Sequence, residues 1–126
     1  MNIPKDLLYT EDHEWIKVNG TEATIGVTDF AQKELGDIVF VEVETVDETL
    51  DKGEAFGTIE AVKTVSDLFM PVAGRVIELN KQLDSEPEII NKDPYGNGWI
   101  VKIKMSDTKE LNDLLDADAY KASIEA

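Results

Sequence analysis

The chain has 126 residues, of which 27 are acidic and 12 basic, so its formal net charge is −15 at pH 7. This length suits a single domain, and a domain of this size buries roughly two-thirds of its unfolded surface. The charge disfavours nucleic acids and anionic membranes, because binding to phosphate requires lysine and arginine. It favours basic protein partners, although solubility alone explains it equally well. The absence of cysteine excludes disulfides, a thiolate nucleophile and a thiolate metal site.

The sequence contains no targeting pattern that we can identify. No apolar run is long enough to span a bilayer. The first fifteen residues have neither the apolar core of a secretory signal nor the arginine-rich pattern of a transit peptide. We therefore expect a cytoplasmic protein that contacts neither membrane nor nucleic acid.

The N-terminal part of the chain is predicted to form a β-hairpin. Residues 13–18 (HEWIKV) and 21–27 (TEATIGV) are rich in β-branched and aromatic side chains, as strands are. The dipeptide Asn19-Gly20 between them favours the positive φ angles of a type I′ turn. The two segments should therefore pair antiparallel.

A short helix is expected directly after this hairpin. Residues 30–35 form its body, and Thr28 or Asp29 provides the N-cap, because both side chains can accept a hydrogen bond from a free backbone N–H. Gly36 is the expected C-terminal stop, since glycine adopts the left-handed conformation that commonly ends a helix.

Five further segments have the composition of strands and are separated by turn residues. They are 38–43, 55–62, 64–69, 75–79 and 99–105. In the first of these, period-2 alternation predicts Val39, Val41 and Val43 on one face. The stretch before the last strand is polar and contains Pro87 and Pro94.

The C-terminal part has a helical pattern. Asp107 and Glu110 have the spacing of a capping pair, and Leu111, Leu114 and Leu115 form an apolar stripe that should pack against the sheet. A second short helical turn is expected in the last ten residues. Together these elements predict one compact antiparallel β-domain with a short N-terminal helical turn and a helical C-terminal appendage.

The residues do not predict an enzyme active site. The single histidine, His13, lies between Asp12 and Glu14 and has no second ligand at metal-binding spacing. No G-x-S-x-G elbow and no glycine-rich phosphate loop occurs in the sequence. Carboxylates are too numerous for a pair of them to mark acid–base chemistry. We therefore expect no catalytic residue and no metal ligand.

Lys63 has the most distinctive setting in the sequence. Two strand-like segments converge on it, and a Pro-Val-x-Gly turn begins eight residues after it, at Pro71. A lysine at a hairpin tip projects its amine to where a modifying enzyme can reach it. Val62 and Val65 can anchor the turn. Without these flanks, Lys63 would be one of many solvated lysines.

The segment around Lys63 resembles the lipoyl-attachment signature E-x-V-K-x-x-S-D of the glycine cleavage system H protein family. The matching residues are Glu60, Val62, Lys63, Ser66 and Asp67. Further blocks resemble the family in the same order along the chain. They are 9–15 (YTEDHEW), 23–42, 71–80, 91–104 (NKDPYGNGWIVKIK) and 110–120. Several independent blocks make the resemblance specific.

The resemblance implies a mainly β fold, the barrel-sandwich hybrid of two antiparallel sheets found in lipoyl and biotinyl carriers. It implies one lipoyl-carrier domain over 1–126, with N- and C-terminal extensions, that is not itself an enzyme. Its cofactor would be lipoic acid, bound covalently as N6-lipoyllysine at Lys63. Lipoyl-attaching enzymes would load it, and we expect a monomer.

The resemblance also implies a shuttle function. The carrier would take the aminomethyl group of glycine from a pyridoxal-phosphate glycine decarboxylase to a tetrahydrofolate-dependent aminomethyltransferase. It would then deliver the resulting dithiol to dihydrolipoyl dehydrogenase. An additional role as a donor of lipoyl or octanoyl groups to other complexes stays open.

The loaded arm of this family has a chemical weakness. Its free amine can expel the neighbouring thiolate, with release of formaldehyde and ammonia, unless the nitrogen is protonated. Our hypothesis is that Glu14 and Asp67, helped by Asp12, receive the arm and stabilise its ammonium, because a nearby opposite charge favours the charged form. The alternative is that these are exposed carboxylates without a special role.

Three other interpretations remain open from the residues. A biotin carrier usually has A-M-K-M at its lysine, whereas Val62 and Thr64 flank Lys63 here. A lipoyl domain of a 2-oxoacid dehydrogenase typically has D-K-A and belongs to a longer chain with linkers. The third alternative is a plain β-domain for protein contacts, with no cofactor.

Overall fold

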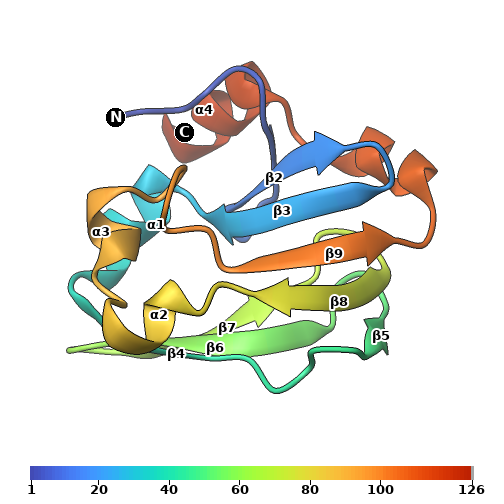
Figure 1. Cartoon of the computed structure of the whole chain (residues 1–126). Coiled ribbons are helices and arrows are strands. Elements are labelled where there is room, and N and C mark those ends of the chain that lie inside the picture. Colours follow the sequence, from blue (N-terminus) through green and yellow to red (C-terminus); the bar gives the residue numbers. More distant parts are fainter. Residues whose placement is uncertain (126) are drawn as a thin grey trace.

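The computed structural model of the chain describes residues 1–125, which form two antiparallel β-sheets with short helices around them (Figure 1). The larger sheet has six strands in the order β1-β2-β3-β9-β8-β5: β1 (Leu8–Tyr9), β2 (Glu14–Asn19), β3 (Glu22–Val27), β9 (Val101–Met105), β8 (Gly74–Leu79) and β5 (Thr49–Leu50). The smaller sheet has the order β4-β6-β7: β4 (Ile38–Glu42), β6 (Ala55–Ala61) and β7 (Val65–Phe69). The predicted mainly β fold of two antiparallel sheets is confirmed.

The helices are short. They are α1 (Asp29–Leu35), α2 (Gln82–Ser85), α3 (Ile89–Lys92), the 3-10 helix η1 (Thr108–Asp113) and α4 (Ala117–Glu125). Figure 1 shows α1, α2 and α3 at one end of the sheets and α4 beside the N-terminal segment. None of these helices, within residues 1–125, is long and apolar enough to cross a membrane.

The main core lies between the two sheets. Its side chains come from both layers: Ile25, Val76 and Ile103 from the large sheet and Ile59 and Leu68 from the small one, all at most 2% exposed. Burying such side chains stabilises the fold by about 1.5–3 kcal/mol each. The sandwich is therefore held by the facing apolar sides of the two sheets.

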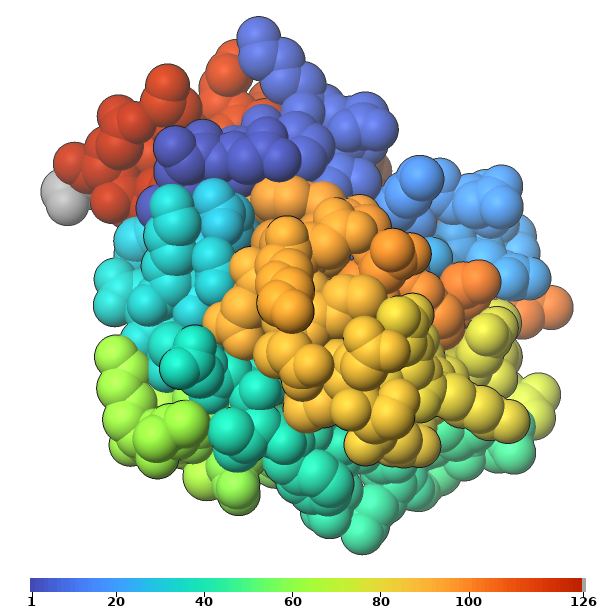
Figure 2. Space-filling model, turned by 60° about the vertical axis from the view of Figure 1, so that its left-hand side comes forward, coloured from blue at the N-terminus to red at the C-terminus, as the bar shows by residue number. Residues whose placement is uncertain are grey.

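A second, aromatic core joins the two ends of the chain. The rings of Tyr9 and Tyr120 stack with their centroids 4.7 Å apart, and Trp15 is buried in the same cluster. Tyr9 and Leu115 also form an isolated backbone bridge. Figure 2 shows the N-terminal residues lying against the C-terminal helix.

The first hairpin pairs as predicted, but its turn is different. Asn19 pairs with Glu22, so Gly20 and Thr21 are the central turn residues. Gly20 has a φ of +66°, whereas Asn19 and Thr21 are not among the residues with positive φ. This is the pattern of a type II′ turn, which needs glycine at its first central position. The predicted type I′ turn at Asn19-Gly20 is wrong because the strand pairing continues through Asn19.

The predicted helix after the hairpin is α1, and its predicted cap residues are confirmed. Thr28 is the N-cap, and its hydroxyl oxygen accepts a hydrogen bond from the Ala31 N–H at 3.1 Å. Gly36 ends the helix with a φ of +84°, and its N–H donates to the Gln32 carbonyl. Thr28 is fully buried, so this cap also fixes how α1 leaves β3.

The predicted common face of Val39, Val41 and Val43 is wrong for Val39. A β-bulge lies between Ile38 and Phe40, and an extra residue on one strand breaks the period-2 alternation. Val41 is buried, whereas Val39 is 45% and Phe40 49% exposed. The bulge therefore turns two apolar side chains of β4 toward solvent.

Two other segments differ from expectation. The polar stretch with Pro87 contains the one-turn helices α2 and α3, which bury Leu83 and Ile90 in the core. At the C-terminus, Asp107 caps a 3-10 helix as predicted, but Glu110 does not complete the capping pair. Its carboxylate accepts instead from the Ala73 N–H at 2.8 Å. The predicted packing of the leucines against the core is confirmed.

The contact between Trp15 and Gly26 gives a test of this fold. The two residues pair across β2 and β3, and a Cβ on Gly26 would lie 2.6 Å from the Trp15 ring. The ring cannot retreat freely, because its Nε1 donates to the Pro94 carbonyl at 2.9 Å. Gly26→Ala should lower the free energy of unfolding by about 1–3 kcal/mol, measured by urea denaturation. Glu22→Ala on the same strand is the control, and equal stability of both variants would contradict this packing.

Candidate functional site

Lys63 lies in the turn between β6 and β7. The Ala61 N–H donates to the Thr64 carbonyl at 2.8 Å, which leaves Val62 and Lys63 as the two central residues of the turn. Both side chains are exposed. The Val62 N–H donates to the Asp37 carbonyl at 3.1 Å and ties the turn to the start of β4. The structure therefore places the amine at a defined, accessible position, as the strand pattern predicted.

The end of α1 forms the surface beneath the lysine. A Cβ built on Gly36 would lie 3.5 Å from Lys63 Cε and 4.0 Å from Nζ, so the aliphatic stem passes over this glycine. Gly36 has a positive φ, which a larger residue could adopt only with strain. The helix stop and the lysine turn are thus packed against each other.

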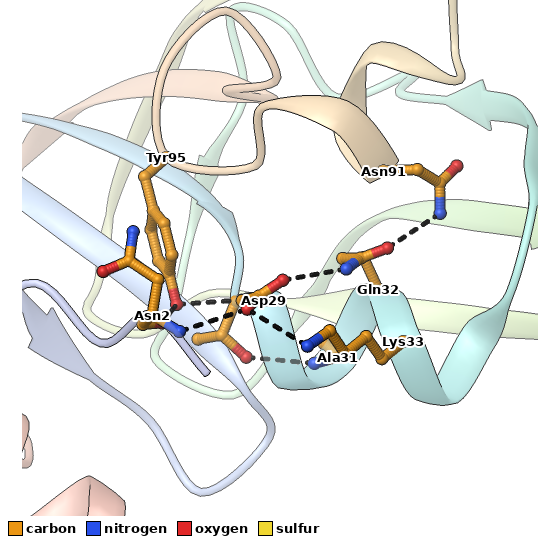
Figure 3. A network of polar contacts seen from close by, with 8 residues as sticks. Asn2, Asp29, Ala31, Gln32, Lys33, Asn91 and Tyr95 are labelled. Atoms are coloured by element: carbon orange, nitrogen blue, oxygen red, sulfur yellow. Dashed lines mark hydrogen bonds and ion pairs between the residues drawn. The ribbon is translucent and has the colours of Figure 1, made fainter.

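Asn91 of α3 holds this surface in place. Its Nδ2 donates to the Gly36 carbonyl at 2.8 Å and to Gln32 Oε1 at 3.1 Å, and its Oδ1 accepts from the Ile38 N–H at 2.9 Å. Gln32 in turn donates to Asp29 at 2.8 Å (Figure 3). Sequence reasoning missed Asn91 as a site residue. The only signal was its position as the first residue of the family-like block 91–104.

A cavity of about 150 Å³ lies between α1, the start of β2 and β7. All three predicted arm-docking residues, Asp12, Glu14 and Asp67, line it, and so does Ser66. Its apolar wall includes Leu35 and Leu68, among others. The other residues of the motif are elsewhere: Glu60 faces solvent from the outer side of β6, and Val62 is in the turn.

Glu14 is the most unusual residue of this cavity. It is 2% exposed, its Oε2 accepts from the Phe69 N–H at 2.7 Å, and its Oε1 accepts from the Thr10 hydroxyl at 3.4 Å. Burial raises its pKa from the ordinary value of 4.5 to about 8, against the opposing effect of the Phe69 hydrogen bond. No ion pair among residues 1–125 includes it. The alternative that Glu14 is an exposed carboxylate is therefore wrong.

His13 lies directly before Glu14 in an unusual backbone conformation. It has a φ of +68°, and its Nδ1 lies 3.0 Å from the Tyr120 hydroxyl, which also pairs with Thr28 Oγ1 at 2.7 Å. Burial lowers the pKa of His13, which favours the neutral ring. In the part of the chain that the structure describes, no cluster of three His, Asp or Glu side chains could hold a metal ion.

Comparison with known proteins identifies the family. Residues 7–126 match the family model of the glycine cleavage H-protein. A relative from Bacteroides thetaiotaomicron, named glycine cleavage system H protein, is 58% identical over 124 residues, 98% of each chain. The chain belongs to the glycine cleavage H-protein family. A relative of the same name from Halothermothrix orenii is 52% identical and covers 99% of this chain and 98% of its own.

A solved structure agrees with this assignment. The crystal structure of a glycine cleavage system H protein from Mycobacterium marinum has a TM-score of 0.89 and 38% identity, covering 98% of this chain and 100% of its own. The family is the lipoyl-carrying shuttle of the glycine cleavage system. The predicted family and function are confirmed, and the biotin-carrier, 2-oxoacid dehydrogenase and plain β-domain interpretations are set aside.

The raised pKa of Glu14 predicts how stability depends on pH. Below pH 4.5 the carboxyl is protonated in both the folded and unfolded chain. Between 4.5 and about 8 the folded state keeps the proton that the unfolded state has lost, so this residue reduces stability as pH rises, by at most about 1.4 kcal/mol per unit. Wild type should therefore lose stability relative to Glu14→Gln from pH 5 to pH 8.

Urea denaturation at several pH values measures this difference. Titrations of other groups cancel in the comparison of the two proteins. Glu22→Gln is the matched control, since it removes an exposed carboxylate of the same sheet that does not line this cavity. Parallel pH profiles for wild type and Glu14→Gln would contradict the burial of an acid with a raised pKa.

The three hydrogen bonds of Asn91 predict a second effect on stability. Asn91→Ala leaves the Ile38 N–H and the Gly36 carbonyl without their partner. This should lower the free energy of unfolding by about 1–3 kcal/mol for each of these groups that water does not reach. Asn19→Ala, at an exposed asparagine of the first hairpin, should change the free energy of unfolding by less than about 0.5 kcal/mol. Equal effects of the two substitutions would contradict the role of Asn91 under the lysine turn.

Proposed function

We propose that Lys63 carries the lipoyl group and that the chain presents this arm in turn to the enzymes of the glycine cleavage system. The observation that supports this most is an exposed lysine held in a hydrogen-bonded turn, directly beside a cavity with both apolar and acidic walls. A carrier needs this combination, because the amine must be accessible for acylation while its root stays fixed. The turn matches the attachment motif at Glu60, Val62, Lys63, Ser66 and Asp67.

The residues around Lys63 fit a lipoyl arm. Acylation removes the charge of the amine and leaves a neutral, largely apolar chain, which suits the apolar wall of the cavity at Leu35 and Leu68. When bound, the group would supply a cyclic disulfide, which is reduced as it accepts the aminomethyl unit of glycine and is re-oxidised from the dithiol by dihydrolipoyl dehydrogenase. Lys63 fixes the root of the arm, and the cavity offers its far end shelter from water.

Glu14 and Asp67, with Asp12, would hold the ammonium of the loaded arm. An entering cation favours the ionised carboxyl, so binding should lower the pKa of Glu14 from about 8 and release a proton near neutral pH. The carboxylate then stabilises the ammonium form of the amine, in which the nitrogen lone pair is unavailable to expel thiolate. Burial strengthens this interaction, because the pair is shielded from solvent.

The proposed partners follow the reaction sequence. They are a lipoyl-attaching enzyme, glycine decarboxylase, aminomethyltransferase and dihydrolipoyl dehydrogenase. We place the chain in the cytoplasm as a monomer, a state that the net charge of −15 supports because it makes copies of the chain repel one another.

The attachment site is tested by mass spectrometry. Wild type from a lipoylation-competent host should gain the mass of one lipoyl group, and Lys63→Arg should gain none. Lys17→Arg, at an exposed lysine on β2, is the matched control and should be modified like wild type. Modification that persists in Lys63→Arg, or a biotinyl mass in wild type, would contradict the proposal.

The carboxylates are tested by the lifetime of the loaded protein. A Glu14→Gln, Asp67→Asn variant should release its aminomethyl group as formaldehyde and ammonia faster than wild type. Each 1.4 kcal/mol of lost stabilisation corresponds to about a tenfold faster release. Asp37→Asn, at an exposed carboxylate near the turn, is the control. Unchanged release by the double variant would show that these carboxylates do not protect the amine.

A further inference from the structure

Exposed apolar side chains gather around the lysine turn. Among residues 1–125, seven large hydrophobic side chains are exposed; three of them lie in strands of the small sheet and a fourth lies in the lysine turn. These four, here called the apolar face, are Val39 (45% exposed), Phe40 (49%), Val62 (76%) and Val65 (61%). Single exposed apolar residues are normal, whereas a cluster usually marks an interaction site.

The sheet register places two of these residues, Phe40 and Val65, on one surface. Phe40 of β4 pairs with Glu60 of β6, and Glu60 pairs with Val65 of β7, so the three form one row across the outer side of the sheet. Neighbouring strands are about 4.8 Å apart, so the row spans roughly 10 Å. The row next to it contains Glu42 and Asp67.

The exposed apolar residues of β4 are additional to those that this strand contributes to the core. Ile38 and Val41 of β4 are buried on the inner side, and it is the bulge between Ile38 and Phe40 that turns the neighbouring apolar residues outward. Bulges often re-aim a side chain next to a functional site. Here the affected side chains lie in β4, which pairs with β6 and begins beside the lysine turn, where the Val62 N–H donates to the Asp37 carbonyl.

The charges of this surface indicate what it contacts. Strands β4, β6 and β7 and the turn between the last two contain three carboxylates, Glu42, Glu60 and Asp67, and one cation, Lys63. None of the three carboxylates is in an ion pair within the described range 1–125. They would repel the same face of a second copy and an anionic membrane, but they complement lysine and arginine.

We propose that the apolar face, with Glu42 and Glu60 as its acidic companions, is the docking surface for the enzyme that acylates Lys63. The complementary surface of that enzyme has an apolar centre and a rim of lysine or arginine. The inference rests on the proposed attachment at Lys63. Before acylation only the four-carbon stem of lysine extends from the turn, so the enzyme must contact the residues that immediately flank it. Later partners reach a much longer arm and do not need this contact.

The test compares two matched double variants. Phe40→Thr with Val65→Thr removes the centre of the apolar face, and Val18→Thr with Val46→Thr changes two other exposed valines, 40% and 37% exposed, outside it. With a lipoyl-attaching enzyme, lipoic acid and ATP, the first variant should raise KM at least tenfold and leave kcat within twofold. The control should match wild type. Thermal unfolding midpoints verify that both variants are folded.

Direct binding separates this inference from the proposed function. A Lys63→Arg chain cannot be acylated at that position, yet it should bind the enzyme, and adding Phe40→Thr and Val65→Thr should weaken this binding at least tenfold. Adding Glu60→Lys to the Lys63→Arg chain should also weaken binding to the enzyme, and added salt should weaken binding of Lys63→Arg itself.

Unchanged KM and binding for the apolar variants, or a wild-type dimer that Phe40→Thr dissociates, would overturn the docking surface. Failure of wild type to be acylated at Lys63 would instead contradict the proposed function.

Discussion

The hydrogen bond from the Phe69 amide to the buried carboxyl of Glu14 connects the two sheets at the candidate site. Phe69 is the last residue of β7, and Glu14 is the first of β2 in the other sheet. The same carboxyl lines the cavity beside the lysine turn. A buried acid without a counter-ion is costly when ionised, and its raised pKa expresses that cost. One residue thus couples sheet packing to the electrostatics of the cavity.

The rest of the chain supports this connection from both sides. The stacked rings of Tyr9 and Tyr120 join the N- and C-terminal segments beside β2, and the Tyr120 hydroxyl contacts both His13 and the cap residue Thr28. On the other side, Asn91 ties α3 to the end of α1 and the start of β4. The turn that holds the lysine is therefore supported from both sides, while the lysine side chain itself is exposed.

The small sheet has two sides with different chemistry. Its inner side closes the core and contributes Leu68 to the cavity, where an arm attached to Lys63 would be sheltered. Its outer side carries the apolar row of Phe40 and Val65, with Glu60 between them. Lys63 lies in the turn between β6 and β7, at the edge where the inner and outer sides of this sheet meet. In the two proposals, this single hairpin therefore serves enzyme recognition on one side and protection of the arm on the other.

The sequence by itself determined the elements whose signals are local. Thr28 and Gly36 mark the ends of α1 because caps depend on neighbouring residues, and the lysine turn follows from two strand patterns that meet at it. Only the tertiary structure decided the rest. The bulge at Phe40, the burial of Glu14 and the three hydrogen bonds of Asn91 depend on partners far along the chain. Such contacts arise when the sheets pack, and no local pattern encodes them.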